Sequence, residues 1–140
     1  MKNSKVLMLA VMGLFLLGSC SKDDESATDY LTGGTWKITE SRSDIDGDGD
    51  LDDDLESCSR DDEYDFEKDG TLNFDDGAVK CDPTDPQTTT GVWALSGDEK
   101  TLTLTVDGFG FAFEVISLTK SRMELRSELF GYTSELVFTR

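Results

Sequence analysis

Thr101-Leu-Thr-Leu-Thr-Val-Asp-Gly-Phe-Gly-Phe-Ala-Phe113 is the stretch that determines the fold class. Apolar residues occupy every second position on both sides of Asp107-Gly108, which is the period of a strand with one buried face. Asp-Gly is a preferred two-residue hairpin turn. With the turn placed there, the pairs on one face are Val106 with Phe109, Leu104 with Phe111 and Leu102 with Phe113. The stretch therefore predicts a β-hairpin with one apolar face.

The same alternation, interrupted by Gly and Asp turns, continues from Thr35 to the end of the sequence, with almost no helical periodicity. We expect seven or eight strands, because residues 109–119 can form one long strand or two. The predicted strands cover residues 35–41, 62–67, 71–75, 90–96, 101–106 and 109–116 with 117–121, and the last unit is 123–129 followed by 132–140.

Three further turns set the register of neighbouring strands. A three-residue loop at Lys68-Asp69-Gly70 requires Gly70 in the left-handed conformation. Two-residue turns are expected at Lys120-Ser121 and Phe130-Gly131. The resulting pairs are Phe66 with Leu72, Tyr64 with Phe74, Leu118 with Met123, Ile116 with Leu125, Leu129 with Tyr132, Leu125 with Leu136, and Met123 with Phe138. The inward positions change from odd to even numbers after Phe113, which predicts a β-bulge near Val115.

A meander with one apolar face buries that face and hides its edges by closing into a barrel. We therefore predict an all-β fold, a small up-and-down antiparallel β-barrel. An eight-stranded barrel either fills its interior with side chains or holds one small ligand, and composition leaves both open. The interior set is Trp36, Ile38, Tyr64, Phe66, Leu72, Phe74, Trp93, Leu95, Leu102, Leu104, Val106, Phe109, Phe111, Phe113, Ile116, Leu118, Met123, Leu125, Leu129, Leu136 and Phe138. Its aromatic members Trp36, Tyr64, Trp93, Phe111 and Phe113 are the candidate ligand contacts.

The N-terminus has the order of a secretory signal peptide: Lys2 and Lys5, an apolar run over residues 6–17, then small residues before Cys20. Twelve apolar residues are too few to span a bilayer, which needs about 20. The ending Leu17-Gly18-Ser19-Cys20 resembles the bacterial lipobox. That resemblance implies cleavage before Cys20 and diacylation of its thiol, with the lipid bilayer as a partner.

The segment after Cys20 is polar and charged, and residues 20–30 are expected to be a solvated tether. Its Lys22-Asp23-Asp24-Glu25 run resembles the signal that directs lipoproteins of the Bacteroidetes to the outer face of the outer membrane. The resemblance implies an outer-membrane lipoprotein exposed on the cell surface. Retention at the periplasmic leaflet is the alternative.

Charge and composition exclude several classes of function. The chain has 140 residues and a net charge of −17, and removal of residues 1–19 with their two lysines makes the mature 121-residue chain −19. Such a surface repels nucleic acid, whereas cations and basic partners remain plausible. There is no histidine, so Ser-His-Asp and Cys-His catalysis and histidine-bearing zinc sites are excluded. Carboxylate pairs such as Asp61 and Asp62 have almost no specificity as an acid–base signal, and we expect no enzyme.

Cys58 and Cys81 remain after the lipidated cysteine is set aside. Two cysteines in an exported protein usually form a disulfide, whereas a catalytic or metal-binding pair lacks the spacing and a histidine partner. The three-residue loop at Lys68–Gly70 also brings the two cysteines nearly opposite each other. We predict the bridge Cys58–Cys81.

Several motifs occur in an order similar to that of the lipocalin-like lipoproteins of the Bacteroidetes. They are Gly34-Thr35-Trp36 at the first strand, Asp46-x-Asp48-Gly49, Cys58-x-x-Asp61-Asp62, Phe66-x-x-Asp69-Gly70-Thr71, Cys81-Asp82 and Gly91-Val92-Trp93. The resemblance covers about residues 30–140, so a lipocalin-like domain is expected at 31–140. It implies a small barrel that binds a hydrophobic ligand.

Residues 44–69 hold 14 of the 30 acidic residues. Asp44-x-Asp46-x-Asp48-Gly49-Asp50 matches the first half of an EF-hand calcium loop, with alternating carboxylates, a glycine for the sharp turn and a carbonyl from Asp50. Asp52 fits the ninth position, and Asp54 or Glu56 completes the shell because the twelfth position is Leu55. Calcium is the predicted ion. The alternative is a solvated acidic loop, although seven aspartates within eleven residues repel one another unless something neutralises them.

Two functions follow from these observations. The first is a lipid-anchored envelope protein whose barrel binds a small apolar or amphipathic ligand. The second is a surface interaction module whose acidic loop, with or without calcium, contacts a basic protein or a glycan. The volume of the barrel interior distinguishes them.

Overall fold

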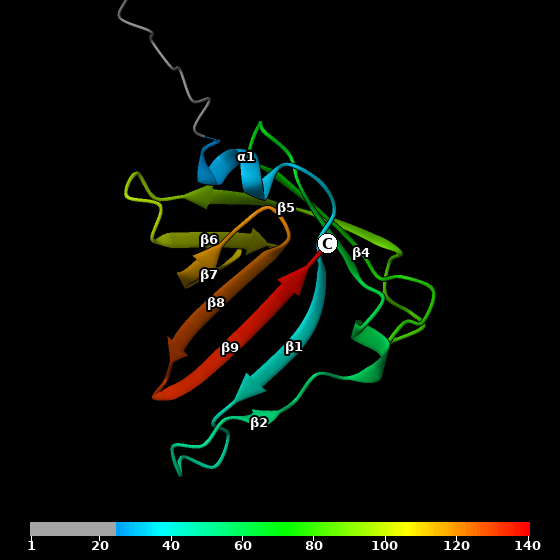
Figure 1. The fold of residues 1–140 in the computed structure, drawn as a ribbon. Coiled ribbons are helices and arrows are strands. Elements are labelled where there is room, and N and C mark those ends of the chain that lie inside the picture. Colours follow the sequence, from blue (N-terminus) through cyan, green and yellow to red (C-terminus); the bar gives the residue numbers. More distant parts are fainter. Residues whose placement is uncertain (1–24) are drawn as a thin grey trace, which may run out of the picture.

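The chain folds as an antiparallel meander that curls into a half-barrel (Figure 1). The computed structural model describes residues 25–140; the predicted signal peptide, Cys20 and the Lys22–Asp24 part of the surface signal lie outside them. The elements are α1 (Ala27–Leu31), β1 (Lys37–Ser43), β2 (Asp52–Asp53), the 3-10 helix η1 (Ser57–Ser59), β3 (Glu63–Phe66), β4 (Thr71–Asp75), β5 (Thr88–Leu95), β6 (Thr101–Val106), β7 (Phe109–Leu118), β8 (Arg122–Leu129) and β9 (Tyr132–Thr139). Within this part of the chain, no helix has the length and hydropathy needed to cross a membrane.

The sheet has the strand order β2-β1-β9-β8-β7-β6-β5-β4-β3. Its two ends meet at one bridge, where Trp36 and Tyr64 exchange two backbone hydrogen bonds of 2.8 Å. The sheet is therefore closed just before β1 and splayed further along it. The predicted all-β, up-and-down antiparallel fold is confirmed, but within residues 25–140 the sheet has nine strands in place of the predicted seven or eight and closes only partly into a barrel.

The turn chemistry sets the register as predicted. Asp107 and Gly108 have φ of 52° and 81°, and Phe130 and Gly131 have φ of 54° and 87°. Positive φ at both central residues is the type I′ geometry that matches the twist of a hairpin. Gly70 has φ of 91°, as the three-residue loop requires. All the predicted cross-strand pairs are observed except the pair of Ile116 with Leu125.

The predicted β-bulge lies in the long strand β7, between Val115 and Ser117. Leu125 pairs with Val115, so the prediction that it pairs with Ile116 is wrong. Ile116 is the extra residue of the bulge and is 46% exposed. A second irregularity, between Ile38 and Glu40 of β1, was not predicted, because no apolar residue follows Ile38 in that strand to reveal the change.

Helix α1 was not predicted, and its residues 27–30 had been assigned to the tether. Ser26 caps it in a capping box with Asp29, and Leu31 is fully buried. Five residues are too few to show helical periodicity, which explains the omission. The side chains of Lys68 and Asp29 form an ion pair of 3.3 Å, which fixes α1 beside the β3–β4 turn. The helix therefore covers the closed end of the half-barrel (Figure 1).

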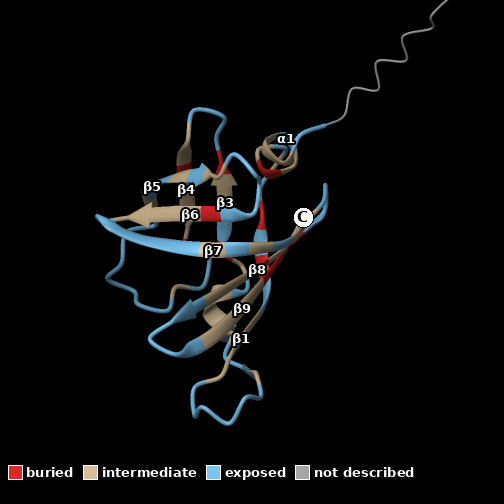
Figure 2. Cartoon of the chain, turned by 90° about the vertical axis from the view of Figure 1, so that its left-hand side faces the viewer, coloured by how far each residue is buried: buried red, intermediate tan, exposed pale blue. Residues whose placement is uncertain are grey.

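The core fills this closed end. Its buried residues are Leu31, Trp36, Ile38, Phe66, Leu72, Leu102, Met123, Leu125 and Phe138. Phe109 and Leu129, predicted to point inward, are 70% and 52% exposed, and Phe111 is also exposed. These residues lie near the hairpin turns at the opposite, splayed end, where no strand crosses over them. Figure 2 shows buried positions near α1 and long exposed stretches of β7.

The disulfide between Cys58 and Cys81 is present, with the two Cα atoms 5.2 Å apart. This confirms the prediction from cysteine parity, since bridged Cα atoms lie about 4.4–6.8 Å apart. The bridge ties η1 to the segment 76–87 that joins β4 to β5.

Candidate functional site

The open end of the half-barrel contains a cavity of about 410 Å³. Because the strands are antiparallel, the end of β4, the start of β5, and the β6–β7 turn all meet at this end. Six of its twelve lining residues are apolar side chains from β4, β6 and β7: Leu72, Phe74, Leu104, Val106, Phe111 and Phe113. The interior is therefore partly a cavity and partly a packed core, a combination that composition alone did not reveal.

Tyr64 of β3 completes the aromatic wall. Its ring centre lies 5.0 Å from that of Phe74 and 5.2 Å from that of Phe138. Burial, together with the nearby charges of Asp62 and Asp76, raises the pKa of the Tyr64 phenol to about 12. Tyr64 is therefore a neutral phenol at physiological pH.

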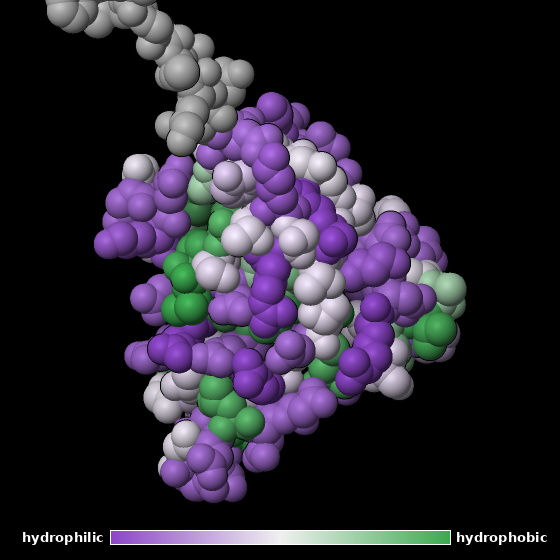
Figure 3. Space-filling model, viewed as in Figure 1, coloured by the Kyte–Doolittle hydropathy of each residue, from purple (hydrophilic) through white to green (hydrophobic). Residues whose placement is uncertain are grey.

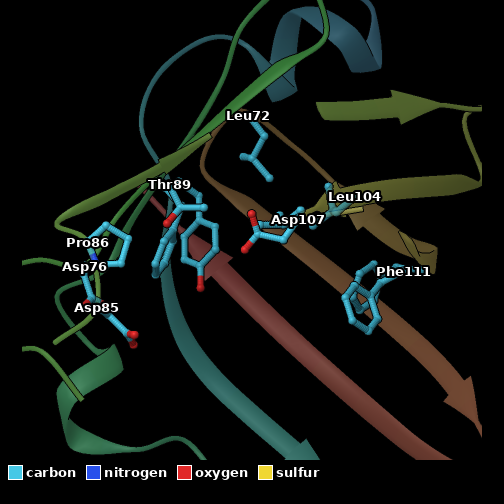
Figure 4. Close-up of a pocket in the computed structure, with 12 residues that line it drawn as sticks. Leu72, Asp76, Asp85, Pro86, Thr89, Leu104, Asp107 and Phe111 are labelled. Atoms are coloured by element: carbon cyan, nitrogen blue, oxygen red, sulfur yellow. The ribbon is translucent and has the colours of Figure 1, made fainter. Parts of the chain in front are cut away.

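Acidic groups lie at the mouth of the cavity. Asp76, Asp85 and Asp107 line it together with Pro86 and Thr89, and none of its twelve lining residues is basic. Figure 4 shows Asp76, Asp85 and Pro86 on one side of the cavity and Asp107, Leu104 and Phe111 on the other. Along β4 the lining changes from Leu72 near the closed end to Asp76 at the mouth, so the cavity is apolar at depth and negatively charged at its entrance.

Asp76 has a second carboxylate beside it. The β3–β4 register pairs Glu63 with Asp75. The adjoining residues, Asp62 just before β3 and Asp76 just after β4, therefore lie opposite each other. The two aspartates are only 4% and 8% exposed. Burial, and then the charge of Asp76, raises the pKa of the Asp62 carboxyl to about 6. Like charges that face each other across a hairpin are destabilising, so this pair lowers the stability of the folded state.

Two of these carboxyl oxygens have no hydrogen-bond partner within residues 25–140, namely Asp62 Oδ1 and Asp76 Oδ2. By contrast, Asp61 Oδ2 accepts hydrogen bonds of 2.6 and 3.1 Å from the amides of Ala78 and Val79. Asp61 therefore has a structural role, because it holds the segment that contains Ala78 and Val79.

The predicted ligand contacts divide into two groups. Tyr64, Phe111 and Phe113 line the cavity. Trp36 does not: it is fully buried at the closed end, and its indole nitrogen donates a 2.9 Å hydrogen bond to the carbonyl of Leu31. Trp93 also lies away from the cavity, with its indole nitrogen bonded to the carbonyl of Glu67. Both indole rings therefore bond to the backbone at the closed end of the half-barrel and do not line the cavity.

Asp62 and Asp76 were not predicted to lie at the cavity. The register contained this signal, because Asp62, just before β3, continues the inward positions 64 and 66, and Asp76, just after β4, continues the inward positions 72 and 74. Acidic residues are so frequent in this chain that the sequence does not distinguish a buried aspartate from the solvated ones.

The acidic loop lies outside the barrel, beyond β1 and β2 (Figure 1). Asp44, Asp46 and Asp48 each bring one carboxylate oxygen within 4.8 Å of the others. The amides of Gly47 and Asp50 donate hydrogen bonds of 2.8 and 2.9 Å to the carboxylates of Asp44 and Asp48, which holds the loop in shape. The three converging carboxylates fit a hard cation such as calcium.

The other predicted metal ligands are placed differently. Asp52 begins β2 and pairs with Ser43, and the carboxylate of Asp54 accepts a 2.6 Å hydrogen bond from the Ser43 hydroxyl. Glu56 lies near Cys58 at η1. The carboxylates of Asp52, Asp54 and Glu56 do not join the group formed by Asp44, Asp46 and Asp48, while the carbonyl expected from Asp50 stays a prediction.

Comparison with known families identifies the architecture. The lipocalin-like domain family matches residues 32–125, from before β1 into β8. The chain belongs to the lipocalin-like domain family. A lipocalin-like protein from Bacteroides uniformis ATCC 8492 is similar in structure, with 18% sequence identity and a TM-score of 0.49 over 79% of this chain and 98% of that one. No curated protein matches the chain significantly. The lipocalin-like fold is a ligand-binding fold in general, because its barrel encloses a cavity.

Proposed function

We propose that this lipocalin-like protein is a lipid-anchored cell-envelope binding protein whose cavity takes a small apolar or amphipathic ligand. The observation that carries the proposal is the cavity of about 410 Å³ with six apolar side chains in its wall. This volume is within the range of about 300–1,000 Å³ typical of small-molecule sites. Binding rather than catalysis is proposed, because Asp61 is bonded to loop amides and the chain has no histidine.

A matched pair of valine variants tests the cavity. Val106 lines it, whereas Val92 is exposed on the neighbouring strand β5. We expect the neutral fluorescent probe N-phenyl-1-naphthylamine to bind the mature Cys20→Ser chain saturably and with 1:1 stoichiometry. Val106→Phe should fill the cavity and abolish binding, whereas Val92→Phe should not change it. Thermal unfolding verifies that both variants are folded. An absence of saturable binding, or equal binding by both variants, would contradict the proposal.

The anchor is proposed from Cys20 and its lipobox. Cys20→Ser in the full chain should abolish incorporation of labelled palmitate and release the protein from the membrane fraction. Protease treatment of intact cells then distinguishes surface display from the periplasmic leaflet. A variant that stays in the membrane fraction would exclude the anchor.

A second candidate function is contact of the acidic loop with a basic protein or a glycan. The convergence of Asp44, Asp46 and Asp48 outside the barrel favours it. Asp46→Ala/Asp48→Ala should weaken such contacts and leave binding of N-phenyl-1-naphthylamine unchanged. Loss of probe binding in this variant would mean that the loop belongs to the cavity site.

A further inference from the structure

We propose that the cavity selects organic cations: molecules with an apolar body and one protonated amine or guanidinium, which pairs with Asp76 and is attracted further by the neighbouring charge of Asp62. This inference rests on the proposed function, because it names the ligand class of the same cavity. It follows from three observations: the sign of the charges, the unpartnered oxygens and the order of groups along the cavity.

The charge at the mouth has one sign. Asp76, Asp85 and Asp107 line the cavity, and Asp62, which is not a lining residue, lies opposite Asp76 across the β3–β4 hairpin. None of these four carboxylates is in an ion pair formed within residues 25–140. Lys80 is close, but its amine donates to the backbone carbonyl of Asp85 rather than to a carboxylate. A ligand anion would therefore be repelled, and a cation would enter a field in which four carboxylates outnumber the one nearby ammonium group of Lys80.

The buried pair requires a donor. Asp62 and Asp76 are more than nine-tenths buried, and each leaves one oxygen unpartnered. Buried carboxylates are normally paired or hydrogen-bonded, because an uncompensated charge in a low-dielectric site is costly. Within residues 25–140, the groups that act on the Asp62 carboxyl besides Asp76 are Asp61, Asp75 and the Ser59 hydroxyl, and none of them is positively charged. An ammonium or guanidinium group supplies both positive charge and several N–H donors.

The order of groups in the cavity sets the orientation of the ligand. Leu72 and Leu104 lie on the apolar wall, and Asp76 lies one strand repeat beyond Phe74 towards the mouth. An apolar body can then fill the depth while its cationic end stays at the mouth. Tyr64 also lines the cavity and pairs with Phe74, one level from Asp62 and Asp76, and aromatic rings of this kind attract cations.

An isosteric probe series tests the inference on the mature Cys20→Ser chain. Octylamine, octanol and octanoate share one chain and differ in charge. In displacement of N-phenyl-1-naphthylamine at pH 7.5, octylamine should bind at least about tenfold more tightly than octanol, since charge-assisted hydrogen bonds are the stronger class. Octanoate should bind more weakly than octanol. Asp76→Asn and Asp62→Asn should each reduce the preference for the amine, whereas Asp65→Asn, on the outward face of β3, should retain it.

Each outcome decides a different question. If the neutral probe binds but octylamine and octanol bind equally, the cationic specificity is wrong and the cavity function stands. If neither the probe nor any octyl compound binds, both proposals fail. If calorimetry with calcium chloride shows binding that Asp76→Asn abolishes, and the amine has no advantage over the alcohol, the pair is a metal site and the inference is overturned. Thermal unfolding of each variant excludes misfolding as the cause.

Discussion

The guanidinium of Arg140 lies 4.3 Å from the centre of the Trp36 ring. The same side chain donates hydrogen bonds to the carbonyls of Tyr30, Gly34 and Lys120. It thereby joins the last strand, the segment before β1 and the β7–β8 turn. Because Trp36 also binds the carbonyl of Leu31, these contacts hold α1 against the closed end of the half-barrel. Closure at this end leaves the cavity open only at the other.

Arg140→Ala should lower the free energy of unfolding by about 1–3 kcal/mol, because it removes a cation–π contact and hydrogen bonds to carbonyls. Arg140→Lys should recover part of the loss, since a lysine keeps the charge but cannot bridge the carbonyls. Arg122→Ala is the control, because its ion pairs are exposed on the sheet surface. Denaturant unfolding measures all three. Equal losses in Arg140→Ala and Arg122→Ala would contradict the role of the stack.

The buried Asp62 predicts an unusual pH dependence. Its pKa is raised from 3.8 to about 6, so the folded state binds this proton more tightly than the unfolded chain does. The free energy of unfolding therefore falls as pH rises from about 4 to about 6, by at most about 3 kcal/mol from this group. Asp62→Asn removes the charge and should be more stable than wild type at pH 7.5, with the difference disappearing near pH 4.

The difference in the free energy of unfolding between wild type and Asp62→Asn isolates the contribution of Asp62 from that of the other acidic residues. Hydrogen bonds from Ser26 lower the pKa of Asp29, and those from Thr84 lower the pKa of Asp82, so these groups favour unfolding as pH falls below their usual range. Their contributions are the same in wild type and in Asp62→Asn, so they cancel in the difference between the two stability curves. Stability curves that run parallel from pH 4 to 7.5 would mean that Asp62 titrates normally.

Turn residues and alternation made most of the fold predictable. Asp107-Gly108, Phe130-Gly131 and Gly70 occupy the positive φ values that their turns need, so the pairing of six strands followed from local chemistry. The closed end was less predictable. Trp36 and Trp93 look like ligand contacts in a list of inward aromatics, but their hydrogen bonds to the carbonyls of Leu31 and Glu67 depend on long-range packing.

The cavity residues, like the fold, were only partly predictable from the sequence. Tyr64, Phe111 and Phe113 were predicted at the cavity because alternation sets which face they share. How much of that face stays open depends on where the sheet splays, which the bulges control. Asp76 could not be predicted, because its burial, and not its residue type, distinguishes it from the many solvated acidic residues in this chain.

The disulfide should stabilise the mouth of the cavity. It closes a segment of about 24 residues, so Cys58→Ala/Cys81→Ala should lower the free energy of unfolding by about 3 kcal/mol in the chain-entropy model. The segment 76–87 supplies Asp76, Asp85 and Pro86 to the cavity, so its amides should exchange faster in the variant. Hydrogen exchange measures this, with β8 amides as the internal reference. Uniform acceleration along the chain would indicate global destabilisation alone.

Calcium binding to the acidic loop is the remaining prediction. Asp44, Asp46 and Asp48 already converge, and Gly49 has φ of 94°, the left-handed conformation expected at the sharp turn of such a loop. A calcium ion would remove the mutual repulsion of the carboxylates. Because only the folded loop presents them together, calcium should raise the free energy of unfolding by about 2.7 kcal/mol at a hundredfold excess over the dissociation constant.

Thermal unfolding in calcium and in chelator measures this effect. Wild type should melt at a higher temperature in calcium, and Asp46→Ala/Asp48→Ala should melt at the same temperature in both. Asp65→Ala/Glu114→Ala removes the same charge from the sheet surface and should keep the calcium response, which separates ion binding from a general loss of negative charge. Asp54→Ala should also keep the response, because the Asp54 carboxylate is bonded to Ser43. If wild type melts identically with calcium and with chelator, and calorimetry gives no heat at millimolar calcium, the converging carboxylates do not bind the ion.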